Sequence, residues 1–147
     1  MKLMIDENIL REKAKKYLVC FHATCPRREH CLRWIASHYV PERLFSVICI
    51  NPNHVGDVTD SCIAYRDDQP QRVPVGMVHF YEAMPGAMER AIKSRLIEYY
   101  SRVIYYRYRR GELLITPDVE QVIERVCREC GWTAPLVFDG YSEELLW

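Results

Sequence analysis

The stretch TPDVEQVIERVCRECG, residues 116–131, carries the clearest structural signal in the sequence and predicts an α-helix. Thr116 is a residue type favoured as a helix N-cap, Pro117 suits the first helical position, and Gly131 suits the position after the last turn. The apolar residues between these ends recur at helical spacing: Val119, Val122, Ile123, Val126 and Cys127. We therefore expect one face of this helix to be buried.

Three further helices are predicted upstream of this one. One begins at Pro85 and either continues or breaks before Gly111, with an apolar stripe of Met88, Ala91, Ile92, Leu96, Tyr99 and Val103. The other two lie near the N-terminus, from the N-cap residue Asp6 to near Cys20, and from Pro26 to residue 39. The chain thus has two early and two late helices.

The middle of the chain favours strands. Residues 44–50, 62–66 and 73–81 are rich in strand-forming side chains and are separated by turn-forming clusters, and residues 136–138 add a further short candidate. We predict an α+β fold: two N-terminal helices, a small antiparallel sheet, and two later helices packed on it. A chain of 147 residues is expected to form a single domain over residues 1–147.

Composition and the first residues indicate a compartment. The chain is 49% hydrophobic and 27% charged, as in ordinary folded proteins and unlike disordered chains. Asp6 and Glu7 interrupt the region where a signal peptide needs an apolar run, and no apolar run approaches the roughly 20 residues of a membrane span. We therefore expect a cytoplasmic protein without a membrane partner, whose seven cysteines stay reduced.

The net charge of zero is the sum of two unlike parts. Residues 1–111 have a net charge of +6, and residues 112–147 have a net charge of −6. Such asymmetry is typical either of contact with nucleic acid or of an acidic tail that folds back on a basic body. The two charged surfaces could also pair between copies in a homodimer.

Four cysteines form a candidate metal site. Cys20, Cys25 and Cys31 cluster at the turn between the first two helices, and Cys62 joins them if the chain folds back. Four thiolates are the ligand set of a structural zinc site or of an iron–sulfur cluster, and His22 or His30 could each replace one sulfur. In the competing interpretation these are buried thiols that pack like small hydrophobic residues, which suits Cys31.

The remaining cysteines are predicted to be core residues. Cys127 and Cys130 form a Cys-x-x-Cys at the end of a helix, where the helix dipole disfavours the thiolate that redox chemistry needs. Cys49 alternates with apolar residues in a predicted strand.

Tyrosines and arginines alternate in segment 99–110, which follows several basic residues. Tyrosine rings that stack on bases and guanidinium groups that hold phosphates are typical of single-stranded nucleic-acid surfaces. In the second interpretation the rings pack inward and arginine stems cover them. The candidate partner-binding residues are Arg102, Tyr106, Arg107, Tyr108, Arg109 and Arg110.

Signatures of common enzymes are missing from the sequence. The six glycines form neither a dinucleotide fingerprint nor a phosphate loop, and there is no nucleophile elbow and no His-Glu-x-x-His. No catalytic residues are predicted, and a non-enzymatic role is favoured.

Several motifs resemble those of a domain family of unknown function from gut bacteria. They are Cys-x4-Cys-Pro-x4-Cys-Leu-Arg from Cys20 to Arg33, Tyr105-Tyr106 with Arg109-Arg110-Gly111-Glu112, the helix over residues 116–131, and Phe138-Asp139 with the acidic, Trp-ended tail. The resemblance implies a small, cytoplasmic, single-domain protein, and it implies no activity, cofactor or catalytic residue.

Together these observations predict a non-enzymatic binding or regulatory module with a structural zinc site at Cys20, Cys25, Cys31 and Cys62. An iron–sulfur cluster on the same residues would instead make it a redox or electron-transfer protein. The third alternative is a metal-free protein that binds another protein, or single-stranded nucleic acid through segment 99–110.

Overall fold

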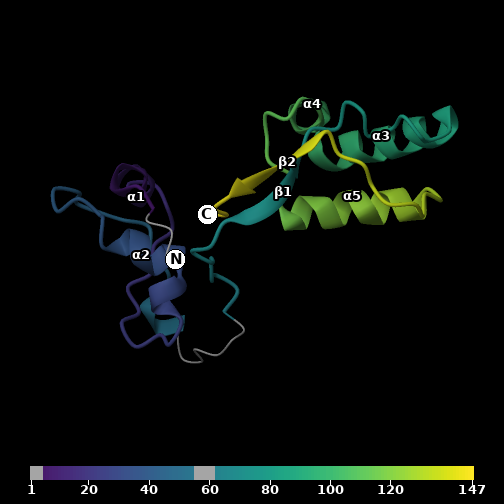
Figure 1. Ribbon diagram of the computed structural model, residues 1–147. Helices are drawn as coiled ribbons and strands as arrows, with labels where there is room; N and C mark the ends of the chain where they lie inside the picture. The colour runs from purple at the N-terminus through teal and green to yellow at the C-terminus, as the bar shows by residue number, and fades with distance from the viewer. Residues whose placement is uncertain (1–4, 55–61) are drawn as a thin grey trace. The chain divides into compact units, whose positions relative to one another are not determined.

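The structure, a computed structural model, describes residues 5–54 and 62–147 and confirms an α+β fold (Figure 1). The chain divides into two compact units: unit 1 is Met1–Pro70 with Leu145–Trp147, and unit 2 is Gln71–Glu144. It therefore passes between the units twice, after Pro70 and after Glu144. The single domain expected over residues 1–147 stays a prediction.

Unit 2 contains the small antiparallel sheet, in which β1 (Gln71–Val75) pairs with β2 (Gly140–Glu144), drawn in teal and yellow in Figure 1. Arg72 lies opposite Glu143 in this pairing. Part of the acidic tail therefore folds back on the basic body, as one interpretation of the charge asymmetry expected.

Most of the predicted strands are wrong. Residues 44–50, 62–66 and 136–138 form no strand, and the predicted strand over 73–81 is replaced by β1 over 71–75. The chain leaves the sheet at Gly76, whose φ of +80° is unfavourable for other residues. A Cβ atom at Gly76 would also lie 2.5 Å from an oxygen of Asp139, which accepts hydrogen bonds from the Val78 and His79 N–H groups.

The later part of the chain has three helices rather than two: α3 (Gly86–Tyr100), α4 (Arg102–Arg109) and α5 (Pro117–Glu129). The helical pattern after Pro85 breaks at Ser101, which has a φ of 74° and whose Oγ accepts a hydrogen bond from the Ile104 N–H. The helix predicted over residues 116–131 is confirmed as α5.

The core of unit 2 is extensive. Its buried members come from the loop before α3, from all three helices and from the chain on either side of α5. They are Met77, Phe80, Tyr81, Met84, Ile92, Leu96, Tyr105, Ile115, Ile123, Val126, Cys127 and Phe138.

Unit 1 has little regular structure among its described residues. Its elements are α1 (Glu7–Ala14), the 3-10 turn η1 (Arg28–His30), α2 (Leu32–Ser37) and the 3-10 turn η2 (Pro52–His54). The two predicted N-terminal helices exist, but both are shorter than expected. The buried members of the hydrophobic cluster here are Leu10, Val19 and Ala36, with partly buried neighbours that include Tyr17 and Trp147.

The longest helix in the described part of the chain, α3, has 15 residues. None of the described helices combines the length and the apolar character that crossing a bilayer requires.

Candidate functional site

Extended segments that are distant in the sequence lie side by side in unit 1. Val19 forms an isolated parallel bridge with Cys49, and Cys31 forms an isolated antiparallel bridge with Asp67. The Cys20 N–H donates to the Arg33 carbonyl at 3.0 Å, and the Leu32 N–H donates to the Arg66 carbonyl at 2.8 Å. These bonds bring the chain near Cys20 and the chain after Cys62 to the two sides of the Cys31–Arg33 segment.

Arg33 is a buried cation that joins the same segments. Its Nε donates to the Ala64 carbonyl at 2.6 Å, and its Nη1 donates to the Leu18 carbonyl at 2.8 Å. Its guanidinium carbon also lies 4.7 Å from the centroid of the Tyr17 ring. A buried charge is costly without such partners, so Arg33 fixes the distance between the Leu18 and Ala64 segments.

The structure brings the four predicted cysteines into one neighbourhood. Cys25 is the last residue of a turn, in which its N–H donates to the His22 carbonyl at 3.3 Å. Cys62 is the first residue of another turn, in which its carbonyl accepts from the Tyr65 N–H at 3.2 Å. The pKa of Cys20 is raised chiefly by burial, and the charges of Cys31, Cys25 and Cys62 raise it further. The thiols of Cys25, Cys31 and Cys62 thus act electrostatically on Cys20, and their joint ligation of a metal ion stays a prediction.

The four thiols are not arranged as a finished ligand set. Within residues 5–54 and 62–147, no group of three or more His, Cys, Asp or Glu side chains could hold a metal ion as placed. His22 and His30 have other partners, because His22 Nε2 lies 3.2 Å from Thr24 Oγ1 and His30 Nδ1 lies 3.3 Å from the carboxylate of buried Asp68.

Of the remaining cysteines, one was predicted wrongly. Cys49 is exposed rather than buried, since residues 44–50 form no sheet strand and Cys49 takes part in an isolated bridge with Val19 instead. Cys127 is a core residue as predicted, and burial raises its pKa to about 12. Cys130 is half-buried against the same core and accepts a contact from the Arg95 guanidinium at 3.8 Å.

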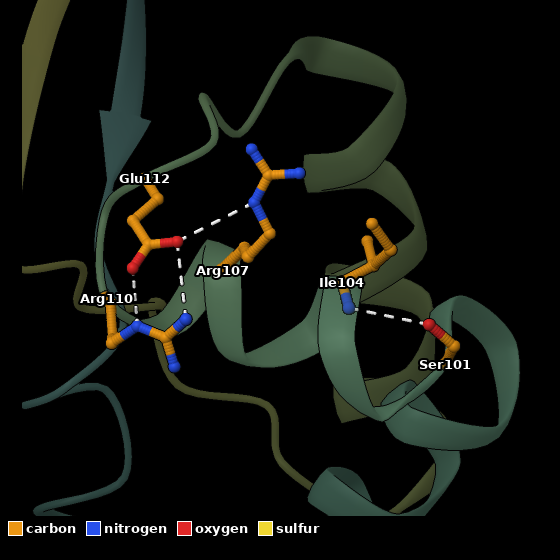
Figure 2. A network of polar contacts seen from close by, with 5 residues as sticks. All are labelled: Ser101, Ile104, Arg107, Arg110 and Glu112. Carbon is orange, nitrogen blue, oxygen red and sulfur yellow. Dashed lines mark hydrogen bonds and ion pairs between the residues drawn. The ribbon is translucent and has the colours of Figure 1, made fainter.

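Two arginines of segment 99–110 are neutralised locally. Figure 2 shows Arg107 and Arg110 turned toward Glu112. Arg110 Nε lies 2.6 Å from one Glu112 oxygen, and Arg107 Nε lies 3.6 Å from the other. The hydrogen bond with Arg110 also lowers the pKa of the Glu112 carboxyl. These two predicted partner-binding residues therefore already have an anionic partner.

Two tyrosines of the segment pack within unit 2. Tyr105 is buried, and its hydroxyl lies 2.8 Å from the hydroxyl of Tyr81. The Tyr108 ring lies 5.3 Å from the Tyr100 ring in an edge-to-face arrangement. Tyr105 and Tyr108 therefore pack inward, as the second interpretation of segment 99–110 predicted.

Tyr106 has a different environment, because cations surround it. Lys93 Nζ and the Arg102 guanidinium carbon each lie 5.4 Å from its ring centroid. A hydrogen bond from Lys93 lowers the pKa of the Tyr106 hydroxyl, and the charges of Arg102 and Arg109 lower it further. The sequence analysis did not identify Lys93, since it lies on α3 and reaches Tyr106 only because the chain turns at Ser101.

One comparison with known proteins gives a match. The model of a family of unknown function, DUF6078, matches residues 4–147, so the chain belongs to that family. No curated protein and no solved structure shows a significant match to the chain.

Proposed function

We propose that this member of DUF6078 is a non-enzymatic binding or regulatory module in which one zinc ion, bound by Cys20, Cys25, Cys31 and Cys62, completes the fold of unit 1. The observation that carries the proposal is the set of main-chain hydrogen bonds that joins the chain at Cys20 and at residue 66 to the segment 31–33. The charges of Cys25, Cys31 and Cys62, which raise the pKa of Cys20, support it. A change of χ1 rotamer redirects a thiol without moving the main chain, so a bound ion can collect sulfurs that already share one neighbourhood.

The small core of unit 1 supports this proposal. Its buried hydrophobic residues, among those the structure describes, are Leu10, Ala14, Val19, Cys31, Leu32 and Ala36, while Phe45 and Ile63 are largely exposed. Folded units of this size usually need a disulfide or a metal to supplement such a core. Structural zinc can contribute about 10 to 16 kcal/mol of apparent free energy, which is comparable to the whole stability of a typical domain.

Zinc is preferred over iron for a binding module because it has no redox chemistry. The proposal places the protein in the cytoplasm, where the thiols stay reduced and available as ligands. The module would then present its surfaces to a partner rather than to a substrate.

The test is elemental analysis of the full chain purified without oxygen, together with a visible spectrum. We expect about one zinc per chain, the stoichiometry of a four-thiolate structural site. Cys25→Ser and Cys62→Ser should each lose the metal. Cys49→Ser is the matched control, because Cys49 is an exposed cysteine of the same unit outside the ligand set, and it should retain the metal.

Two results would contradict the proposal. In the first, the chain contains no zinc and its Tm does not rise when zinc is added to the reduced protein. In the second, iron and an equal amount of sulfide appear with visible absorbance, which would indicate an iron–sulfur cluster and a redox or electron-transfer role.

A further inference from the structure

Several described cations of unit 2 form no ion pair, and Lys93, Arg102 and Arg109 are three of them. Arg107 and Arg110 pair with Glu112, and Arg95 pairs with Glu129. In the described part of the chain, no ion pair involves Lys93, Arg102 or Arg109.

These three cations gather at one place. Arg102, Tyr106 and Arg109 follow one another at helical spacings of four and three residues, so they share one face of α4. Lys93 reaches the same tyrosine from α3, with its Nζ 5.4 Å from the ring centroid. Arg109 also approaches the ring of Tyr81, with its guanidinium carbon 6.0 Å from the centroid.

Like charges held together repel unless an anion lies among them. We propose that Lys93, Arg102 and Arg109 form a phosphate-binding site around Tyr106, and that its occupant is the phosphodiester backbone of a single-stranded nucleic acid. This site lies in unit 2 and is independent of the zinc proposal.

The length of the site favours a strand over one small phosphate. At a rise of 1.5 Å per residue, the Cα atoms of Arg102 and Arg109 are separated by about 10 Å along the α4 axis, which is long enough to contact more than one phosphate. Tyr99, just before the break between α3 and α4, contacts the Tyr100 ring edge-to-face at 4.7 Å but is still 58% exposed, so it offers a ring face for stacking on a base. The rings of Tyr105 and Tyr108 are engaged within the unit, so they do not contribute.

The experiment measures binding of the full chain to a fluorescent oligo(dT) of about 20 nucleotides, by anisotropy over a salt series. Each phosphate contact to a single strand contributes about −0.7 to the slope of log K against log salt, so three contacts predict a slope of about −2. Lys93→Gln and Arg102→Gln should each reduce the slope by about 0.7 and weaken binding several-fold at low salt.

The matched control is Arg107→Gln, which removes the same charge from the same helix but from a side chain already paired with Glu112. Its binding should stay within about twofold of wild type, since exposed neutralised pairs contribute little. Unchanged melting curves of the three variants would show that each effect is local.

Several results would overturn the inference. Absence of binding at about 20 mM salt would remove the site altogether. An equal loss in Arg107→Gln and Arg102→Gln would show that only net charge matters. Competition by polyglutamate as strong as that by unlabelled oligo(dT) would exclude phosphate recognition, and equal competition by pyrophosphate would exclude the strand as occupant.

Discussion

Replacement of Arg33 by methionine should disassemble the cysteine-bearing part of unit 1. Methionine keeps an apolar stem but donates no hydrogen bond, so the Leu18 and Ala64 carbonyls lose their bonds of 2.8 and 2.6 Å. Hydrogen bonds from a charged donor contribute about 1.5 to 3 kcal/mol each. Because water can reach carbonyls in loops and recover part of this, we expect a net loss of about 2 to 4 kcal/mol.

Amide hydrogen exchange, measured by NMR on the full chain, reports this loss of stability directly. The amides of Cys20 and Leu32 donate across the segments that Arg33 joins. A loss of about 2 to 4 kcal/mol should speed their exchange about 30- to 700-fold, at 1.4 kcal/mol for each factor of ten. The amide of Met77 in unit 2 should be unaffected and serves as the internal reference.

Two further variants sharpen this experiment. Arg33→Lys retains the charge but not the planar fork of donors, so its effect should be intermediate. Arg43→Met changes an exposed side chain of the same unit and should alter exchange by less than about threefold, as surface substitutions usually do. The reasoning would be refuted if Arg33→Met behaved like Arg43→Met at both amides.

Three more outcomes follow from single contacts. Trp147→Ala removes a ring 5.6 Å from Tyr17 and should destabilise unit 1 by about 1 to 3 kcal/mol in urea unfolding, without affecting exchange in unit 2. Tyr81→Phe leaves the buried Tyr105 hydroxyl without its 2.8 Å partner and should cost about 1 to 3 kcal/mol, measured by thermal melting. Because burial raises the pKa of Cys127 to about 12, alkylation of this thiol in the folded protein should be slow at pH 8 and should accelerate as the pH approaches 12. The free energy of unfolding should fall as the pH rises above 9.0, the ordinary pKa of the thiol, because the thiol then ionises in the unfolded chain but not in the folded one.

Local signals predicted the helices better than the sheet. The helix over residues 116–131 carries its own cap residues and its own apolar face, so α5 could be identified without knowledge of its neighbours. The strand-forming residues 44–50 were misleading, because strand propensity reflects packing against partner strands, and among the described residues they form an isolated bridge with Val19 and no sheet. The true second strand, Gly140–Glu144, contains two glutamates and lies in the acidic tail, where no strand was predicted.

The tyrosine of α3 that faces the core lies one residue after the predicted one. The predicted stripe placed Tyr99 inward, whereas Tyr99 is 58% exposed and Tyr100 packs against the core. Met88, Ile92 and Leu96 recur every four residues, and Tyr100 continues that series. The break at Ser101 then gives α4 a separate register, which no periodicity across the segment could reveal.

For the candidate sites, the sequence identified residue types but not their partners. The metal site at Cys20 and Cys62 stays a prediction, and the nearby chain is joined by Arg33, whose two carbonyl partners lie on segments far apart in the sequence. In segment 99–110, nothing in the sequence indicated which arginines have a carboxylate partner. Only the fold shows that Glu112 neutralises Arg107 and Arg110 while Lys93 joins Arg102 at Tyr106.

X-ray absorption at the zinc edge on the anaerobically purified full chain tests the central claim most directly. The account predicts a first shell of four sulfur atoms at about 2.3 Å, which falls to fewer sulfurs or loses the metal in Cys62→Ser and is unchanged in Cys49→Ser. A shell made of nitrogen and oxygen, or four sulfurs that persist in Cys62→Ser, would contradict it.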